Sequence, residues 1–156
     1  MKKFKIKATL GITPSVALNY KEASRFITRG ASELFQLDIM EKAYTYDQIE
    51  QVTFVFKQPS GKILAYDMFE TFGDPASIND SFSHVFGPDY NYIALNLKSS
   101  ETAKFEPTKQ GSVVLYEIAI SIDGDDELEN QIYTIVESQP NIAVIDSAYG
   151  EYIGDH

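Results

Sequence analysis

The sequence predicts an all-β domain, and three observations support this prediction. The stretch from Gly111 to Gly124 carries apolar side chains at nearly every second position, which is the two-residue period of a strand. Ten Phe and ten Tyr stand mostly among Ile and Val, without any Trp, and this composition favours strands over helices. Roughly eight such stretches recur about every ten residues, with turn residues between them. This pattern fits an antiparallel sandwich or a small barrel.

Length, charge and the lack of Cys limit the number of domains, the classes of partner and the kinds of cross-link. A chain of 156 residues is most simply one domain spanning residues 1–156. Its formal net charge of −10 repels phosphate backbones and anionic membrane surfaces, so we expect neither a nucleic acid nor a membrane as partner. The absence of Cys excludes disulfides and thiolate metal sites.

The N-terminal third is predicted to contain three strands. Lysine alternates with apolar residues over 4–10, which predicts a strand within an N-terminal arm of residues 1–14 rather than an export signal. Residues 15–22 are polar and without pattern, so we expect a loop there. A short strand is predicted over 23–28, and a longer one over 34–40 directs three residues inward: Phe35, Leu37 and Ile39.

A hairpin is predicted next in the chain. The stretches 51–57 and 62–68 both alternate apolar and polar residues, and Gln58-Pro59-Ser60-Gly61 between them is a typical turn sequence. Residues 71–91 then read as a long loop that carries several aromatic side chains. Loops longer than about 12–15 residues tend to be functional or mobile, so we expect this loop to fold back on the body or to meet a partner.

The remaining chain predicts four more strands and one helical turn. A strand over 91–97 is followed by a hydroxyl-capped turn over 99–105, which Phe105 anchors to the core. The central strand, 114–122, directs five residues to one face: Val114, Tyr116, Ile118, Ile120 and Ile122. An acidic turn connects it to a hairpin partner over 131–136. A last short strand is predicted over 141–145. The core of the domain is thus expected to span about residues 23–145, and residues 146–156 are expected to form a tail.

The acidic turn is the one weak candidate for a metal site. Asp123, Asp125 and Asp126 offer the carboxylate oxygens that calcium prefers. Their spacing does not match a twelve-residue EF-hand loop, because Gly124 directly follows the first Asp. A solvated hairpin turn is therefore the simpler interpretation, and we expect no metal or other cofactor.

No catalytic motif is present in the sequence. His84 is the only internal histidine, and neither a nucleophile elbow nor a zinc-protease motif accompanies it. The nine glycines are scattered and form no phosphate-binding loop. We therefore expect no catalytic residues and no enzymatic activity.

Aromatic residues outside the clearest strands are the candidates for binding. They could stack on a sugar or form a protein interface, where Tyr and Phe are enriched. The absence of Trp favours the protein interface, with a module that binds host glycans as the alternative. The set comprises Tyr44, Tyr46, Phe72, Phe82, Phe86, Tyr90, Tyr149 and Tyr152.

The order of elements resembles that of a known family. Thr28-Arg29-Gly30 follows a short strand, and Glu101-Thr102-Ala103-Lys104-Phe105 precedes the longest strand. These features resemble small tailed-bacteriophage structural proteins, which carry a "T-R-G" strand and a "L-T-x-E-x-T-x-x-F" crossover. The resemblance covers about residues 23–145. The strand at 4–10 and the enlarged loop at 71–91 depart from the family pattern.

The resemblance implies a fold and a role. It implies an immunoglobulin-like β-sandwich, similar to the N-terminal domains of phage baseplate and upper-tail proteins. It further implies a non-enzymatic virion protein of the capsid, neck, tail or baseplate, made in the bacterial cytoplasm and bound to other virion proteins in an oligomeric assembly. We expect contacts through added edge strands at 4–10 or 142–145 and through exposed rings. The expected contact residues are Phe4, Ile6, Phe72, Phe82, Phe86, Tyr90, Tyr149 and Tyr152.

Overall fold

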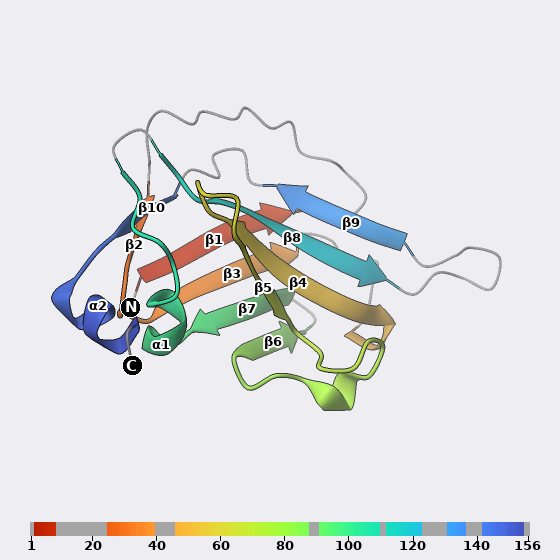
Figure 1. The fold of residues 1–156 in the computed structure, drawn as a ribbon. Coiled ribbons are helices and arrows are strands. Elements are labelled where there is room, and N and C mark those ends of the chain that lie inside the picture. The colour runs from red at the N-terminus through yellow and green to blue at the C-terminus, as the bar shows by residue number, and fades with distance from the viewer. Residues whose placement is uncertain are drawn as a thin grey trace.

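Most of the regular structure consists of β-strands (Figure 1). The structure, a computed structural model, describes residues 2–8, 25–39, 46–87, 91–109, 112–122, 131–136 and 142–154; in 2–8, 25 and 131–136 it describes the backbone alone. Within these residues there are two four-stranded sheets and one two-stranded sheet. The all-β prediction is therefore confirmed.

The first four-stranded sheet has the order β1-β3-β7-β6. Its strands are β1 (Lys2–Ala8), β3 (Glu33–Ile39), β7 (Asn91–Leu97) and β6 (Phe82–Phe86). β3 pairs antiparallel with β7, and β7 with β6, whereas β1 runs parallel to β3. The predicted N-terminal strand thus lies at one edge of this sheet.

The second four-stranded sheet has the order β5-β4-β8-β9 and is antiparallel throughout. Its strands are β5 (Ile63–Asp67), β4 (Ile49–Lys57), β8 (Leu115–Ile122) and β9 (Gln131–Val136). Both predicted hairpin pairings, β4 with β5 and β8 with β9, are confirmed. These two pairings are predictable because each hairpin joins neighbouring segments of the chain.

The two-stranded sheet joins β2 (Arg25–Thr28) to β10 (Ile142–Ile145) in parallel. The parallel pairs β1–β3 and β2–β10 correct the expectation of an antiparallel arrangement throughout. Parallel pairing joins strands that no short turn connects, so the local turn signals of the sequence do not report it.

One hydrophobic core lies between the two larger sheets. Phe35 of β3 meets Phe56 of β4 edge to face at 5.0 Å between ring centroids, and Phe54 of β4 meets Phe82 of β6 at 5.8 Å. Such edge-to-face contacts are the preferred geometry of aromatic pairs. The five inward residues predicted for the central strand are all buried.

The predicted helical turn is present as α1 (Ser99–Thr102), and Phe105 beyond it is buried as expected. The predicted hydroxyl cap is wrong, because the residue at the N-cap is Lys98 and its side chain makes no capping bond. The hydroxyl that matters is that of Thr102. It donates to the carbonyl of Ala31 at 2.8 Å and so ties α1 to the segment after β2.

Two segments predicted to be irregular contain regular structure. The tail contains the helix α2 (Ala148–Gly154), and the loop at 71–91 contains the 3-10 turn η2 (Pro75–Ser77) and the strand β6. A further 3-10 turn, η1 (Tyr46–Gln48), precedes β4. In β6 the rings of Phe82, His84 and Phe86 alternate with Ser83 and Val85, a strand period that the surrounding Gly, Asn and Ser obscure.

Some predictions concern residues outside the described ranges: the loop at 15–22, the acidic turn at 123–129, Tyr44 and Tyr90. Phe4 and Ile6 lie in β1, where the backbone is described. In the described part of the chain, no helix has the length and apolarity needed to span a bilayer.

Candidate interaction surface

The helix α2 packs directly on the turn that follows β2. Gly30 has φ +84°, and a Cβ placed on it would lie 2.8 Å from the Cα of Gly150. A Cβ on Gly150 would lie 2.5 Å from the carbonyl oxygen of Arg29. Both distances are shorter than real Cβ contacts, so the two backbones approach as closely as only glycine permits.

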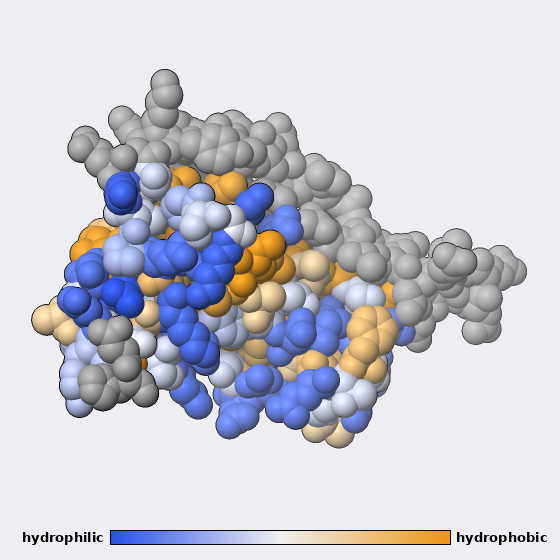
Figure 2. Space-filling model, viewed as in Figure 1, coloured by the Kyte–Doolittle hydropathy of each residue, from blue (hydrophilic) through white to orange (hydrophobic). Residues whose placement is uncertain are grey.

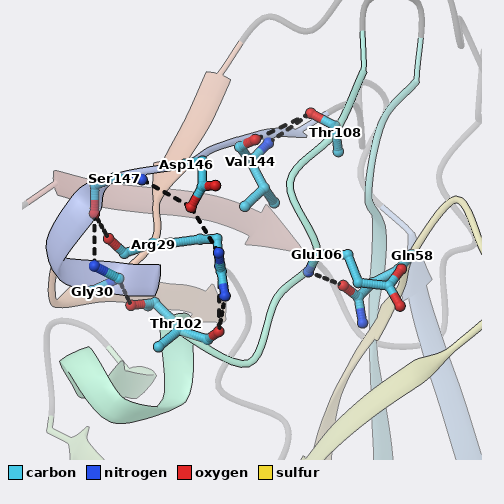
Figure 3. Close-up of polar contacts among 11 residues, drawn as sticks. Arg29, Gly30, Gln58, Thr102, Glu106, Thr108, Val144, Asp146 and Ser147 are labelled. Carbon is cyan, nitrogen blue, oxygen red and sulfur yellow. Dashed lines mark hydrogen bonds and ion pairs between the residues drawn. The ribbon is translucent and has the colours of Figure 1, made fainter. Parts of the chain in front are cut away.

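The Arg29 side chain connects three segments at this junction (Figure 3). Its Nε and Nη2 donate to the carbonyl of Ala103, at the end of α1, at 3.3 and 2.9 Å. Its Nη1 forms an ion pair with Asp146 Oδ1 at 2.7 Å. Because guanidinium donors lie in one fixed plane, these contacts hold α1 and the start of α2 in a defined geometry.

Hydroxyl groups complete the junction. The amide of Gly30 donates to Thr102 Oγ1 at 3.0 Å. Ser147 Oγ donates to the carbonyl of Arg29 at 2.6 Å and accepts from the amide of Gly150 at 2.9 Å. Ser147 therefore caps the N-terminus of α2 while it binds the turn after β2. We call this set the C-terminal clasp: Arg29, Gly30, Thr102, Asp146, Ser147 and Gly150.

Exposed apolar side chains gather on the elements that the C-terminal clasp holds. Of the six large apolar residues exposed in the described part of the chain, four come from β2, β10 and α2. Figure 1 shows these three elements together at one end of the molecule. We call the four residues the terminal face, with their exposed fractions: Phe26 (45%), Ile145 (46%), Tyr149 (60%) and Tyr152 (60%).

The backbone places these side chains in two pairs. In the β2–β10 register Val144 lies beside Ile27, and both are buried. Phe26 and Ile145, each one position away, therefore share the outer face of this sheet. Tyr149 and Tyr152 are three residues apart on α2 and so lie on one side of the helix.

The predicted contact residues whose side chains the structure describes fall into two groups. Tyr149, Tyr152 and Phe72 are exposed, as a contact requires. Phe82 is buried against Phe54, where a partner does not reach it, and Phe86 is partly buried against the core. Phe26 and Ile145 were missed because each stands beside another apolar residue, so the alternation alone does not tell which side faces out.

The rings of β6, within the 71–91 loop, pack against the body of the protein. Tyr46 stacks on His84 with ring centroids 4.0 Å apart and an angle of 5° between the ring planes, and it also meets Phe69 and Phe86. Burial in this stack lowers the pKa of His84. Burial is the main cause that raises the pKa of Tyr46, and the nearby Asp47 carboxylate is the second cause. Phe72 is the exposed ring of the described loop residues, so these residues offer no platform of several rings for a sugar.

No group of three or more His, Asp or Glu side chains in the described ranges could hold a metal ion. Asp123, Asp125 and Asp126 lie outside those ranges, so the weak calcium candidate stays a prediction.

Comparison with known proteins adds no family assignment. No protein-family model matches the chain, and no curated protein matches it at a significant level.

Proposed function

We propose that this protein is a non-enzymatic structural subunit whose terminal face binds another protein in an assembly. The observation that carries this proposal is the concentration of four exposed apolar side chains on the three elements of one end. Aromatic side chains are enriched at protein interfaces, and a few well-placed ones supply much of the binding energy.

The rigidity of this end supports the proposal. Arg29 binds both Ala103 and Asp146, and the Gly30–Gly150 contact leaves α2 little room to move. A surface held in place before binding loses less conformational entropy when a partner docks. The C-terminal clasp therefore favours a contact that needs no rearrangement of α2.

Edge-strand addition at residues 142–145 has little support, because β10 is paired on both sides. Beyond β2 it exchanges hydrogen bonds with Val114, at 2.7 and 3.2 Å, through Ile142. Val144 accepts from the amide of Thr108 at 3.0 Å and donates to its hydroxyl at 2.9 Å. β1, at the edge of its sheet, stays the candidate for a strand-mediated contact by the N-terminal arm.

For the assembly itself we propose a bacteriophage virion, with other virion structural proteins as partners and an immunoglobulin-like sandwich as the fold. This proposal is supported by the positions that the residues of the two resembling motifs occupy in the fold. Arg29 and Gly30 of the "T-R-G" segment lie at the centre of the C-terminal clasp, and Thr102 and Phe105 of the crossover are both buried. Two four-stranded sheets around one core also suit a sandwich.

Mass spectrometry of purified phage particles tests this proposal. The chain should be present in a fixed ratio to the other structural proteins. Combining Tyr149→Ser with Tyr152→Ser should reduce its incorporation, whereas Phe72→Ser, which removes an equally exposed ring elsewhere, should not. Particles without the chain would refute the virion role. Loss of incorporation with Phe72→Ser alone would refute the terminal face.

A further inference from the structure

The strand β5 presents an open edge. It is the last strand of the β5-β4-β8-β9 sheet, so β4 covers only one of its two sides. Within the described ranges, no residue forms a hydrogen bond with the backbone of β5 on the other side. Open edges are templates for pairing with another strand, and proteins usually protect them.

The pairing with β4 identifies the backbone groups on that open edge. Lys62 accepts a hydrogen bond from the amide of Gln58 at 2.9 Å, and Met68 donates to the carbonyl of Val52 at 2.8 Å. Alternate residues of a strand direct their backbone groups to opposite sides, so the even-numbered residues of β5 bind β4. The amides and carbonyls that face away from β4 belong to Ile63, Ala65 and Asp67.

The side chains of β5 leave this edge accessible. Ile63 is 56% exposed and Ala65 is also exposed, whereas Leu64 and Tyr66 are partly buried against the core. The strand contains no Pro, and its only charged residue, Asp67, is at its end. Figure 2 shows apolar atoms among hydrophilic ones near the middle of the face on which β5 lies. The strand β10 differs from β5 in this respect, because Thr108 and Val114 form hydrogen bonds with its backbone on the side away from β2.

The charges beside β5 differ between its two ends. Lys57 and Lys62 lie at its start, and Asp67 and Glu70 lie at its end. All four residues are exposed. In an antiparallel pair of two β5 strands, the basic start of one strand lies against the acidic end of the other. The strand is thus electrostatically complementary to a second copy of itself.

We infer that two copies of the protein associate by antiparallel pairing of β5 with β5. The register centred on Ala65 pairs all three outward-facing residues and brings each Lys62 near the acidic end of the other copy. Each copy contributes a four-stranded sheet, so the pair forms one continuous sheet of eight strands. This contact does not involve the terminal face, so it holds or fails independently of the proposed function.

Sedimentation of the purified full chain at several concentrations tests the pairing. It is best done at about 0.15 M salt, where the Debye length of about 8 Å screens the net charge of the two copies but not closely approaching pairs. Ala65→Pro removes an amide on the open edge without removing a bond to β4, and Ile63→Lys adds a charge there. Each should weaken dimerisation about tenfold or more. Ala65→Ser keeps the amide and is the matched control.

Exchanging the charges of Lys62 and Asp67 gives a second test, which predicts a recovery of dimerisation as well as a loss. Lys62→Glu places acidic side chains at position 62 of one copy and at Asp67 of the other, and Asp67→Lys places basic side chains at position 67 of one copy and at Lys62 of the other, so each variant should self-associate about tenfold less than the parent. An equimolar mixture of the two variants is complementary again and should form mixed dimers. The double variant, with the two charges exchanged, should recover self-association.

Backbone amide exchange gives the direct readout. Raising the protein concentration should protect the amides of Ile63, Ala65 and Asp67, while Leu64 and Tyr66 are protected at every concentration. A protein that stays monomeric, a dimer that Ala65→Pro and Ile63→Lys leave unchanged in folded protein, or a mixture of charge variants that does not associate would each overturn the inference.

Discussion

The loop at 71–91 and the C-terminal segment at 146–154 have similar compositions but opposite structures. Both combine Gly, Ser and Asp with aromatic residues. In the loop, β6 turns Phe82 into the core, and His84 and Phe86 pack with Tyr46. In the C-terminal segment, Gly150 faces the body, and Tyr149 and Tyr152 face outward. The comparison shows that backbone packing, and not aromatic content, decides which rings can reach a partner.

The largest expected effect concerns the buried ring of the loop. Phe82→Ala should lower the free energy of unfolding by about 3–5 kcal/mol, because it leaves a cavity against Phe54. Phe72→Ala, at the exposed ring of the same loop, should change it by less than about 0.5 kcal/mol. Denaturant unfolding measures both. Equal effects would contradict the division of the loop into a buried and an exposed part.

The second effect concerns the close contact of α2. Gly150→Ala should destabilise the protein by about 2–3 kcal/mol and detach α2, because its Cβ meets the backbone of Arg29. Gly73→Ala is the control in the loop. There a Cβ meets nothing within 4 Å, so only the positive φ of +77° opposes it, at about 1 kcal/mol. Thermal unfolding and amide exchange of residues 148–154 distinguish the two.

The third effect concerns the Arg29 side chain. Arg29→Met should cost about 2 kcal/mol, since it leaves the carbonyl of Ala103 without its donors and Asp146 without its ion-pair partner. Lys104→Met removes an exposed ion pair with Glu101 and should cost at most about 0.5 kcal/mol. A cost for Arg29→Met no larger than for Lys104→Met would show that the C-terminal clasp does not hold α2.

The smallest effect is a pH dependence in the loop. Burial lowers the pKa of His84 below its ordinary value of 6.5, so the unfolded chain binds a proton at a higher pH than the folded protein does. The stability contributed by neutral His84 is therefore complete above about pH 6.5 and is lost as the pH falls through the lower, folded pKa. Unfolding measured from pH 7.5 to pH 5 should show this loss, and His84→Phe should remove it. An unchanged pH profile would contradict the burial of His84.

The sequence predicts most strands of this fold because their side chains alternate. The alternation at Val114–Ile122 and at Phe35–Ile39 correctly identifies the buried faces. It does not report the parallel pairs or the helix α2, whose seven residues include two glycines. Glycine usually disfavours a helix. The presence of glycine at position 150 is explained only by the close approach of Gly150 to the backbone of Arg29.

The candidate surface was predictable in part. Tyr149 and Tyr152 stand out in the sequence as rings beyond the last strand. The C-terminal clasp is not readable from the sequence, because Arg29, Thr102 and Ser147 are far apart along the chain and meet only in the fold. The open edge of β5 likewise becomes visible only when the order of the strands is known.

Oxidative footprinting of the protein, isolated and in its assembled state, tests whether the terminal face is the surface that binds a partner. We expect Tyr149, Tyr152 and Phe26 to react several-fold more slowly in the assembly, while Phe72 reacts equally in both states. Terminal rings that react equally in both states, with Phe72 protected instead, would contradict it and place the contact on the loop.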